Sequence, residues 1–196
     1  MNLSLFIVVL GGRSLKSNIE IHDVRWVLGE TIEDTFPELR KQWLGKKSGL
    51  HIDSYKCIKY IDGYQIVISK SNKDNLNSPK IEDLKLWFVN LGGYNPKKMY
   101  EEHEFTLVVA QKAIEAKKKA KINWETTLKN KHNDDYSGIN YFEQVDDLHP
   151  IKIKNWEIKL IPDVQERSEK IIPDVRRVVI LHQYHQAKPR LVCLEL

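Results

Sequence analysis

The chain has 196 residues, of which 41% are hydrophobic and 30% are charged, and a formal net charge of +4. This composition is ordinary for a soluble globular protein, and no apolar run approaches the roughly 20 residues that a membrane-spanning helix needs. The two cysteines, Cys57 and Cys193, are too few for a disulfide framework, so we expect a cytoplasmic protein.

The sequence is duplicated. Residues 5–60 align with residues 86–141 without a gap, and 15 of the 56 aligned positions are identical, whereas unrelated segments would share about three or four. The apolar start of the chain recurs in mid-chain, so we interpret it as a core strand rather than a signal peptide. The predicted domains are a first repeat over 3–68, a linker over 69–85, a second repeat over 86–161, and a C-terminal extension over 162–196.

Each repeat is predicted to contain the same elements in the order strand, strand, helix, strand, strand. The first strand of each repeat is a mainly apolar run without polar alternation, as in strands that are covered on both faces, and it ends at a Gly-Gly pair. The predicted strands are 5–10, 23–28, 55–60 and 64–68 in the first repeat and 86–91, 104–109, 136–142 and 156–161 in the second.

The helix of the first repeat is predicted from an apolar stripe at spacings of 4, 3 and 4, formed by Ile32, Phe36, Leu39 and Trp43. Thr31 is the predicted N-cap, and Pro37 predicts a kink or a later helix start. The second helix, predicted over 112–124, is rich in alanine, which allows close approach to a sheet.

Turn residues locate the remaining strands. Asp62-Gly63 stands between two strand-like segments and predicts a β-hairpin. In the second repeat, the last strand matches that of the first only after an insertion of eleven residues, which we place around 145–154. The C-terminal extension holds two more strand-like segments, 177–182 and 190–196, which predict a further hairpin.

The element order predicts an α+β fold of two tandem strand-strand-helix-strand-strand repeats. A small sheet with one helix across one face is typical of the β-grasp, or ubiquitin-roll-like, arrangement. We expect the two repeats to be related by an approximate internal two-fold.

The residues around the Gly-Gly pairs are similar to those of a known family. The second repeat reads LWFVNLGGY over 86–94, followed by Glu101 and His103, and the first reads VLGGR over 9–13, followed by NIEIHD over 18–23. Together with His-Ile-Asp at 51–53, these segments resemble the bacterial domain-of-unknown-function family 1543 (DUF1543), in two tandem copies. The resemblance spans residues 3–161 and implies no activity.

Histidines and carboxylates recur at one repeat offset. The candidate binding residues are Glu20, His22, Asp23, His51 and Asp53 in the first repeat and Glu101, His103, Glu104, His132 and Asp134 in the second. Imidazole with carboxylate is the donor set of a divalent metal site or of a general acid–base pair. On this interpretation the residues of each set lie near one another.

A structural interpretation competes with the functional one. On this interpretation His22 and His103 hydrogen-bond a loop end and orient the second strand, since Glu-x-His and His-x-Asp lack the spacing of known metal motifs. Asp53 and Asp134 would then cap a turn. The sequence favours this structural interpretation.

Other motifs are weaker indicators of function. The Gly-Gly pairs match no phosphate-binding fingerprint, and Trp43 and Trp124 are predicted to lie in the core. The basic run from Lys117 to Lys121 is the strongest nucleic-acid candidate, but it contains no arginine, and we expect it to form a solvated face.

We therefore expect a binding or interaction module rather than an enzyme. It would use the loops after Gly12 and Gly93, which an internal two-fold would place as a matched pair for a small ligand or a protein partner. The first alternative is a metal-dependent or acid–base enzyme that uses His22 and His103 with the neighbouring carboxylates. The second alternative is nucleic-acid binding through the face from Lys117 to Lys121.

The same sequence features limit which cofactors and partners we expect. No cofactor is expected, with a divalent metal as the alternative. We expect no contact with nucleic acid or with a membrane, and exposed edge strands favour a homodimer.

Overall fold

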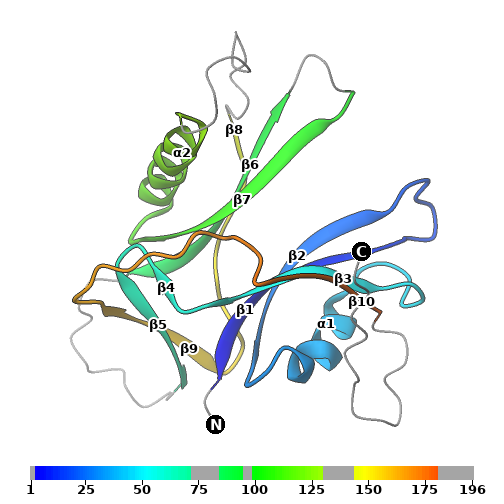
Figure 1. The fold of residues 1–196 in the computed structure, drawn as a ribbon, viewed down its shortest axis with the longest axis horizontal. Coiled ribbons are helices and arrows are strands. Elements are labelled where there is room, and N and C mark those ends of the chain that lie inside the picture. The colour runs from blue at the N-terminus through cyan, green and yellow to red at the C-terminus, as the bar shows by residue number, and fades with distance from the viewer. Residues whose placement is uncertain (1–2, 72–83, 95–98, 130–143, 181–196) are drawn as a thin grey trace. The chain divides into compact units, whose positions relative to one another are not determined.

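A computed structural model describes residues 3–71, 84–94, 99–129 and 144–180 (Figure 1). Over these residues the fold is mixed α and β, with small, mostly antiparallel sheets and two short helices, which confirms the coarse fold class. The β-grasp-like arrangement and the internal two-fold stay predictions.

The contacts divide the chain into two compact units. Compact unit 1 comprises residues 1–59, 66–68 and 169–196, and compact unit 2 comprises residues 60–65 and 69–168. These units are defined by contacts, whereas the predicted repeat boundaries come from the duplication of the sequence. The repeat boundaries stay a prediction.

The sheet of compact unit 1 has four antiparallel strands in the order β10-β3-β1-β2. Their bounds are β1 Ser4–Gly12, β2 Ile21–Gly29, β3 His51–Ile58 and β10 Val175–Ile180. The first strand is central, so its continuous apolar run lies between two neighbours and is buried from Leu5 to Val8. The C-terminal extension thus adds β10 to the edge of this sheet, and the predicted partner segment 190–196 lies outside the described residues.

The predicted apolar stripe forms the contact between helix and sheet. A 3₁₀ turn over Glu33–Thr35 leads into α1, Phe36–Gln42, and Pro37 occupies the first turn, where its missing N–H is not needed. Ile32, Phe36, Leu39 and Trp43 are all at most 7% exposed.

The predicted N-cap is wrong. The residue that precedes α1 is Thr35, and its side chain forms no capping hydrogen bond. Thr31 instead donates its backbone N–H to Oδ2 of Asp34 at 2.8 Å, because the 3₁₀ turn takes up the residues on which the sequence pattern placed the helix start.

The core of compact unit 1 lies between α1 and one face of the sheet. The stripe packs against Phe6, Val8 and Leu10 of β1, together with Val27, Leu50 and Ile52. Since successive side chains of a strand point to opposite faces, the even-numbered residues of β1 face the helix.

Compact unit 2 repeats the same plan. Its three-stranded sheet has the order β7-β6-β8, with β6 at Lys85–Tyr94, β7 at Glu101–Ala110 and β8 at Gln144–Pro150. The helix α2, Ala113–Lys129, packs on this sheet through Ala116 and Ala120, both fully buried. The alanine pattern therefore correctly predicts close approach, although the helix extends beyond residue 124.

The predicted hairpin is present. Its strands are β4, Tyr60–Ile61, and β5, Tyr64–Lys70, and the turn residues Asp62 and Gly63 have φ values of 50° and 78°. Two successive positive φ angles are what an Asp-Gly turn supplies at low cost. The two strands form a second three-stranded sheet with β9, Trp156–Pro162, in the order β4-β5-β9.

Two sequence-based positions need correction. The third strand of the first repeat begins at His51 rather than at residue 55, because polar His51 and Asp53 alternate with buried Ile52. The segment around 145–154, where we placed the insertion, contains β8 itself, so the additional residues precede β8. The strand predicted over 136–142 lies outside the described residues.

Candidate functional site

The candidate residues of the first repeat gather at the Gly-Gly end of the sheet in compact unit 1. Gly11 of β1 stands opposite His22 of β2 on one side and opposite His51 of β3 on the other. A β-carbon built on Gly11 would approach His51, whereas one built on Gly12 would approach Trp43. Because Trp43 belongs to the helix-side core, the histidines lie on the sheet face opposite α1.

Two local features make room for these side chains. Gly11 carries no side chain, and a β-carbon there would lie 2.5 Å from Nε2 of His51 and 3.0 Å from Oδ2 of Asp53. The ladder between β1 and β3 shifts register between Val9 and Leu10, which leaves Asp53 as the extra residue of a β-bulge. Bulges re-aim side chains, and here the bulge lies at the cluster.

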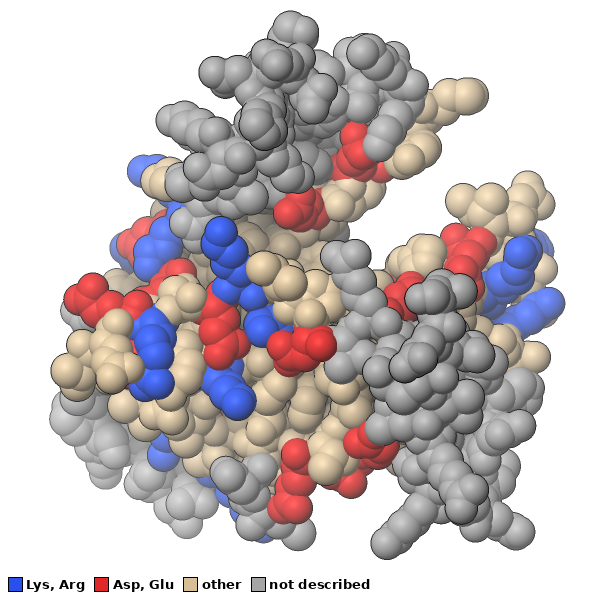
Figure 2. All heavy atoms as spheres, viewed as in Figure 1, with Lys and Arg blue, Asp and Glu red and all other residues tan. Residues whose placement is uncertain are grey.

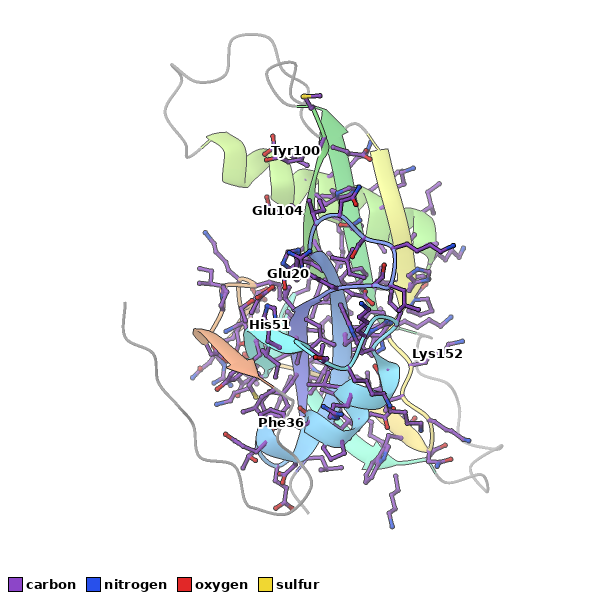
Figure 3. The ribbon with its side chains drawn as sticks, turned by 90° about the vertical axis from the view of Figure 1, so that its right-hand side faces the viewer. Glu20, Phe36, His51, Tyr100, Glu104 and Lys152 are labelled. Atoms are coloured by element: carbon purple, nitrogen blue, oxygen red, sulfur yellow. The ribbon has the colours of Figure 1, made fainter. Side chains whose placement is uncertain are left out.

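Four side chains form a ring of pairs, which we call the histidine–carboxylate cluster: Glu20, His22, His51 and Asp53. Nε2 of His51 lies 3.1 Å from Oδ1 of Asp53 and 3.4 Å from Oε1 of Glu20. Nε2 of His22 lies 3.2 Å from Oδ2 of Asp53 and 3.9 Å from Oε2 of Glu20. Each carboxylate thus lies between the two imidazoles, and Figure 3 shows Glu20 beside His51.

The four side chains differ in exposure. His51 is 14% exposed, whereas the side chains of Asp53, Glu20 and His22 are 30%, 40% and 54% exposed. Nδ1 of His51 is 2.8 Å from the carbonyl oxygen of Gly49, so this ring is held by the loop that precedes β3. A histidine therefore does contact a loop end, but it is His51 rather than the expected His22.

The cluster omits one expected member and changes the role of another. Asp23 forms an ion pair with Arg25, two residues along the same strand, because Asp23 points to the sheet face opposite that of His22. The interpretation of Asp53 as a turn cap is wrong, since Asp53 lies within β3.

The second repeat shows part of the same arrangement. His103 of β7 stands opposite Gly92 of β6, and its Nε2 lies 3.6 Å from Oε2 of Glu101. Glu104 lies next along β7, opposite Leu91. His132 and Asp134 lie outside the described residues.

In the second repeat, the strand register places a residue other than histidine at the position that His51 has in the first repeat. Gln144 of β8 stands opposite Gly92, as His51 stands opposite Gly11, and the ladder shifts register between Asn90 and Leu91 as it does in the first repeat. The position that corresponds to His51 in the sheet is therefore occupied by Gln144.

The cluster is not a preformed metal site. Within the described ranges, no group of three or more His, Cys, Asp or Glu side chains is arranged to hold a metal ion. Each oxygen instead faces an imidazole nitrogen, so the four side chains satisfy one another in pairs.

Sequence reasoning missed the exposed apolar residues of the loops that follow the Gly-Gly pairs. Leu15 and Ile19 are 84% and 76% exposed in the first loop, and Met99 and Tyr100, which precede β7, are 104% and 63% exposed. The sequence could have indicated these residues, because they are large apolar residues within polar segments outside the predicted strands.

The remaining candidates are mostly structural. Trp43 is buried and donates its indole N–H to the carbonyl oxygen of Lys46 at 3.0 Å. Tyr55 packs edge-on against Phe6 across the β1–β3 ladder, which is ordinary cross-strand packing. The side chain of Trp124 is outside the described part.

Some lysines of the basic run in α2 face solvent, and another forms contacts within the fold. Lys117 and Lys118 are exposed. Lys119 donates to the carbonyl oxygen of Val109 at 2.6 Å and lies 3.7 Å from Oδ2 of Asp62. One of these lysines is therefore used to hold β7 and the hairpin turn. No described helix is long and apolar enough to span a membrane.

Comparisons with known proteins agree with the repeat and assign no activity. The chain is similar to a crystal structure of protein Il1583 from Idiomarina loihiensis, with a TM-score of 0.66 and 28% identity over 91% of this chain and 97% of that one. No curated protein matches. The model of the family described as "Domain of Unknown Function (DUF1543)" matches residues 17–68 and 98–148, which together make up more than half of the chain. The chain therefore belongs to the DUF1543 family and carries two copies of its domain.

Proposed function

We propose that this protein is a non-enzymatic binding module that docks a partner protein through the loops after its Gly-Gly pairs. The observation that carries the proposal is the exposure of large apolar side chains in both loops. Leu15 and Ile19 belong to one loop and Met99 and Tyr100 to the other, and all four are more than 60% exposed. Clustered exposed apolar side chains typically mark interaction surfaces.

The loop of the first repeat is ordered by its own hydrogen bonds. The backbone N–H of Ser14 donates to Oγ of Ser17 at 3.0 Å, and Arg13 donates to the carbonyl oxygen of Asn18 at 3.4 Å. The N–H of Lys46 donates to the carbonyl oxygen of Arg13 at 2.7 Å, which ties the loop to the segment after α1. A loop that is ordered before binding loses less conformational entropy when a partner docks.

The charges near the apolar tip define the partner further. Arg13 and Lys16 flank exposed Leu15, and Figure 2 shows charged and uncharged side chains together at the tip of the β1–β2 hairpin. We therefore expect a partner segment that combines large apolar side chains with acidic ones.

The proposal is tested with a random peptide library displayed on phage and selected on the untagged protein. We expect selected peptides to be enriched in large apolar and acidic residues. Binding of a selected peptide should fall at least tenfold in the Leu15→Ser/Ile19→Ser variant, because the truncated side chains supply the apolar contact.

The matched control is Ile114→Ser, which removes a 63% exposed apolar side chain from α2. This variant should bind the selected peptides as the parent protein does. Equal losses in both variants, or selection of peptides without apolar residues, would contradict docking at the loop.

Joint use of the two loops requires the approximate internal two-fold, and the β-grasp-like arrangement, the homodimer and the cytoplasmic location are proposed with it. Light scattering of the purified chain tests the dimer. Nothing in the described residues or in the comparisons indicates catalysis.

A further inference from the structure

Compact unit 2 contains a cavity at the start of β6, at the opposite end of this strand from its Gly-Gly pair. The cavity is lined by the first residues of β6 and by the segment that leads from β8 into β9. Its volume is about 390 Å³, which lies within the range of about 300–1,000 Å³ that is typical of pockets for small molecules.

Backbone hydrogen bonds hold the walls of this cavity in place. The N–H of Ile151 donates to the carbonyl oxygen of Leu86 at 2.8 Å, which continues the β6–β8 ladder beyond its last strand pair. The N–H of Trp156 donates to the carbonyl oxygen of Ile153 at 3.1 Å, at the point where β9 begins. The walls are therefore formed before a ligand binds, which lowers the entropy cost of binding.

Much of the cavity wall is apolar. Leu86 and Ile151 are 2% and 6% exposed and form one part of it. Trp156 and Ile158 form another part, and both are partly buried. Because these two residues are two positions apart in β9, their side chains point to the same face of the strand. An indole beside an aliphatic side chain offers a surface on which a flat aromatic ring can pack.

The charged residues that line the cavity are both basic. They are Lys85 and Lys152, and the described lining residues include no Asp or Glu. Each lysine lies one residue beyond the hydrogen-bonded pair of Leu86 and Ile151, on adjacent segments of the chain, and Lys152 is labelled in Figure 3. Lysine side chains are positively charged at neutral pH, so the charge of this lining favours an anion.

We propose that this cavity binds a small aromatic carboxylate. The ring of the ligand packs against Trp156 and Ile158, and its carboxylate accepts a hydrogen bond from the ammonium group of Lys152, an exposed residue of the lining. An apolar wall with a few polar groups is the usual composition of a small-molecule site. The cavity lies at the other end of β6 from the loop that follows Gly93, so this site does not depend on the proposed docking of a partner protein.

The experiment titrates the nitrogen-15-labelled full chain with 2-naphthoate and follows the indole N–H resonance of Trp156, which a spectrum of Trp156→Phe assigns. We expect a saturable shift of this resonance. The neutral analogue 2-naphthamide has the same rings without the charge, and it should bind about two- to fivefold more weakly, as expected for a partly solvated ion pair. The difference between the two ligands should shrink as NaCl is added, because salt screens exposed charges.

Lys152→Gln should weaken the binding of 2-naphthoate by a similar factor and leave that of 2-naphthamide unchanged. The matched control is Lys154→Gln, which removes an exposed lysine that does not line the cavity, and it should change neither affinity. Ile158→Phe adds a ring to the cavity wall and should abolish the saturable shift with both ligands. The lysine variants keep the test valid if Ile158→Phe does not fold.

Three results would overturn the proposal. They are the absence of a saturable shift of the Trp156 resonance at millimolar 2-naphthoate, equal affinities for the two ligands, and equal losses in Lys152→Gln and Lys154→Gln. Tighter binding of decanoate than of 2-naphthoate would overturn the assignment to an aromatic acid, because it would make the occupant a fatty acid.

Discussion

Gly11 and His51 face each other across the β1–β3 ladder, and a β-carbon on Gly11 would lie 2.5 Å from Nε2 of His51. This glycine therefore provides the space in which the histidine–carboxylate cluster assembles. The requirement comes from the close approach of side chains, and no unusual φ angle is involved at this position.

We predict that Gly11→Ala displaces His51 while the chain stays folded. The added methyl group meets the end of a side chain that can rotate, so the loss in the free energy of unfolding should be about 1 kcal/mol, at the low end of the range for overpacking. The imidazole resonances of His51 in a proton–nitrogen NMR spectrum should shift. Unchanged resonances in a folded Gly11→Ala protein would show that the glycine does not shape the cluster.

The neighbouring glycine provides the contrast. A β-carbon on Gly12 would lie 2.9 Å from the ring of Trp43, which is buried, and 3.5 Å from the backbone of Leu50. Gly12→Ala should therefore destabilise the fold more than Gly11→Ala, by about 1–3 kcal/mol. It should leave the cluster resonances in place.

We predict that Leu39→Ala destabilises compact unit 1 strongly. Leu39 is fully buried between α1 and the sheet, so its truncation removes apolar contacts and leaves a cavity, at a cost of about 2–5 kcal/mol. Denaturant unfolding monitored by circular dichroism measures the loss. Leu44→Ala is the control, because Leu44 is 64% exposed, and it should change stability by less than about 0.5 kcal/mol. Similar losses in both variants would contradict the assignment of the stripe to the core.

The sequence predicts those features of the fold that depend on local patterns. The 4-3-4 spacing identifies the buried stripe from Ile32 to Trp43, and Asp62-Gly63 identifies the hairpin, because both follow from side-chain periodicity and turn conformation. The pairing of β10 with β3 has no local signal, since the two strands are more than 100 residues apart in sequence.

The site could be predicted only in part, because some of its contacts also depend on residues that are far apart in the sequence. The recurrence of Glu20, His22, His51 and Asp53 at one offset selects residues that the structure brings together. The turn of Asp23 toward Arg25 follows from strand alternation, once the bounds of β2 are known. The bulge at Asp53 and the contact of His51 with Gly49 depend on tertiary geometry and leave no pattern in the sequence.

We predict that Asp174→Asn weakens the attachment of the segment that leads into β10. Oδ1 of Asp174 accepts a hydrogen bond from Nζ of Lys56 at 2.9 Å, and Oδ2 accepts one from the N–H of Cys57 at 2.7 Å. Loss of the charge should lower the free energy of unfolding by about 1–2 kcal/mol, with partial exposure of Asp174 limiting the effect.

The pH dependence of this effect has a defined sign. Partial burial lowers the pKa of Lys56, but the hydrogen bonds and charges of Asp174 and Glu169 outweigh it, so the pKa is raised above its ordinary value of 10.5. The contribution to stability is therefore complete below pH 10.5 and is lost as the pH rises through the higher pKa of the folded state. Chemical denaturation at pH 8 and near pH 11 should show the difference between parent and variant shrinking at the higher pH. A constant difference would contradict the charge-based account.

We predict that Asp163→Asn destabilises compact unit 2 in the neutral range but not in strong acid. The guanidinium of Arg167 donates to both carboxylate oxygens of Asp163 at 2.8 Å, and the backbone N–H of Arg167 donates to Oδ2 at 2.9 Å. Arg167 also lies over the ring of Tyr60, at 3.8 Å from the centroid, and its carbonyl oxygen accepts the N–H of Gly63. The turn from Asp163 to Arg167 thus covers the tip of the β4–β5 hairpin, and loss of the carboxylate charge should loosen it.

The hydrogen bonds and charge of Arg167 lower the pKa of Asp163 from 3.8 to about 2. A lowered pKa means that the stabilisation is present above pH 3.8 and disappears as the pH falls through about 2. Thermal unfolding followed between pH 7 and pH 2 should give a lower Tm for Asp163→Asn than for the parent at pH 7. The two Tm values should converge toward pH 2. Arg167→Lys is the matched control, because it keeps the positive charge but loses the two-point guanidinium contact, so it should lower the Tm by a smaller amount. Tm values that differ equally at pH 7 and pH 2 would show that the charge of Asp163 does not hold this turn.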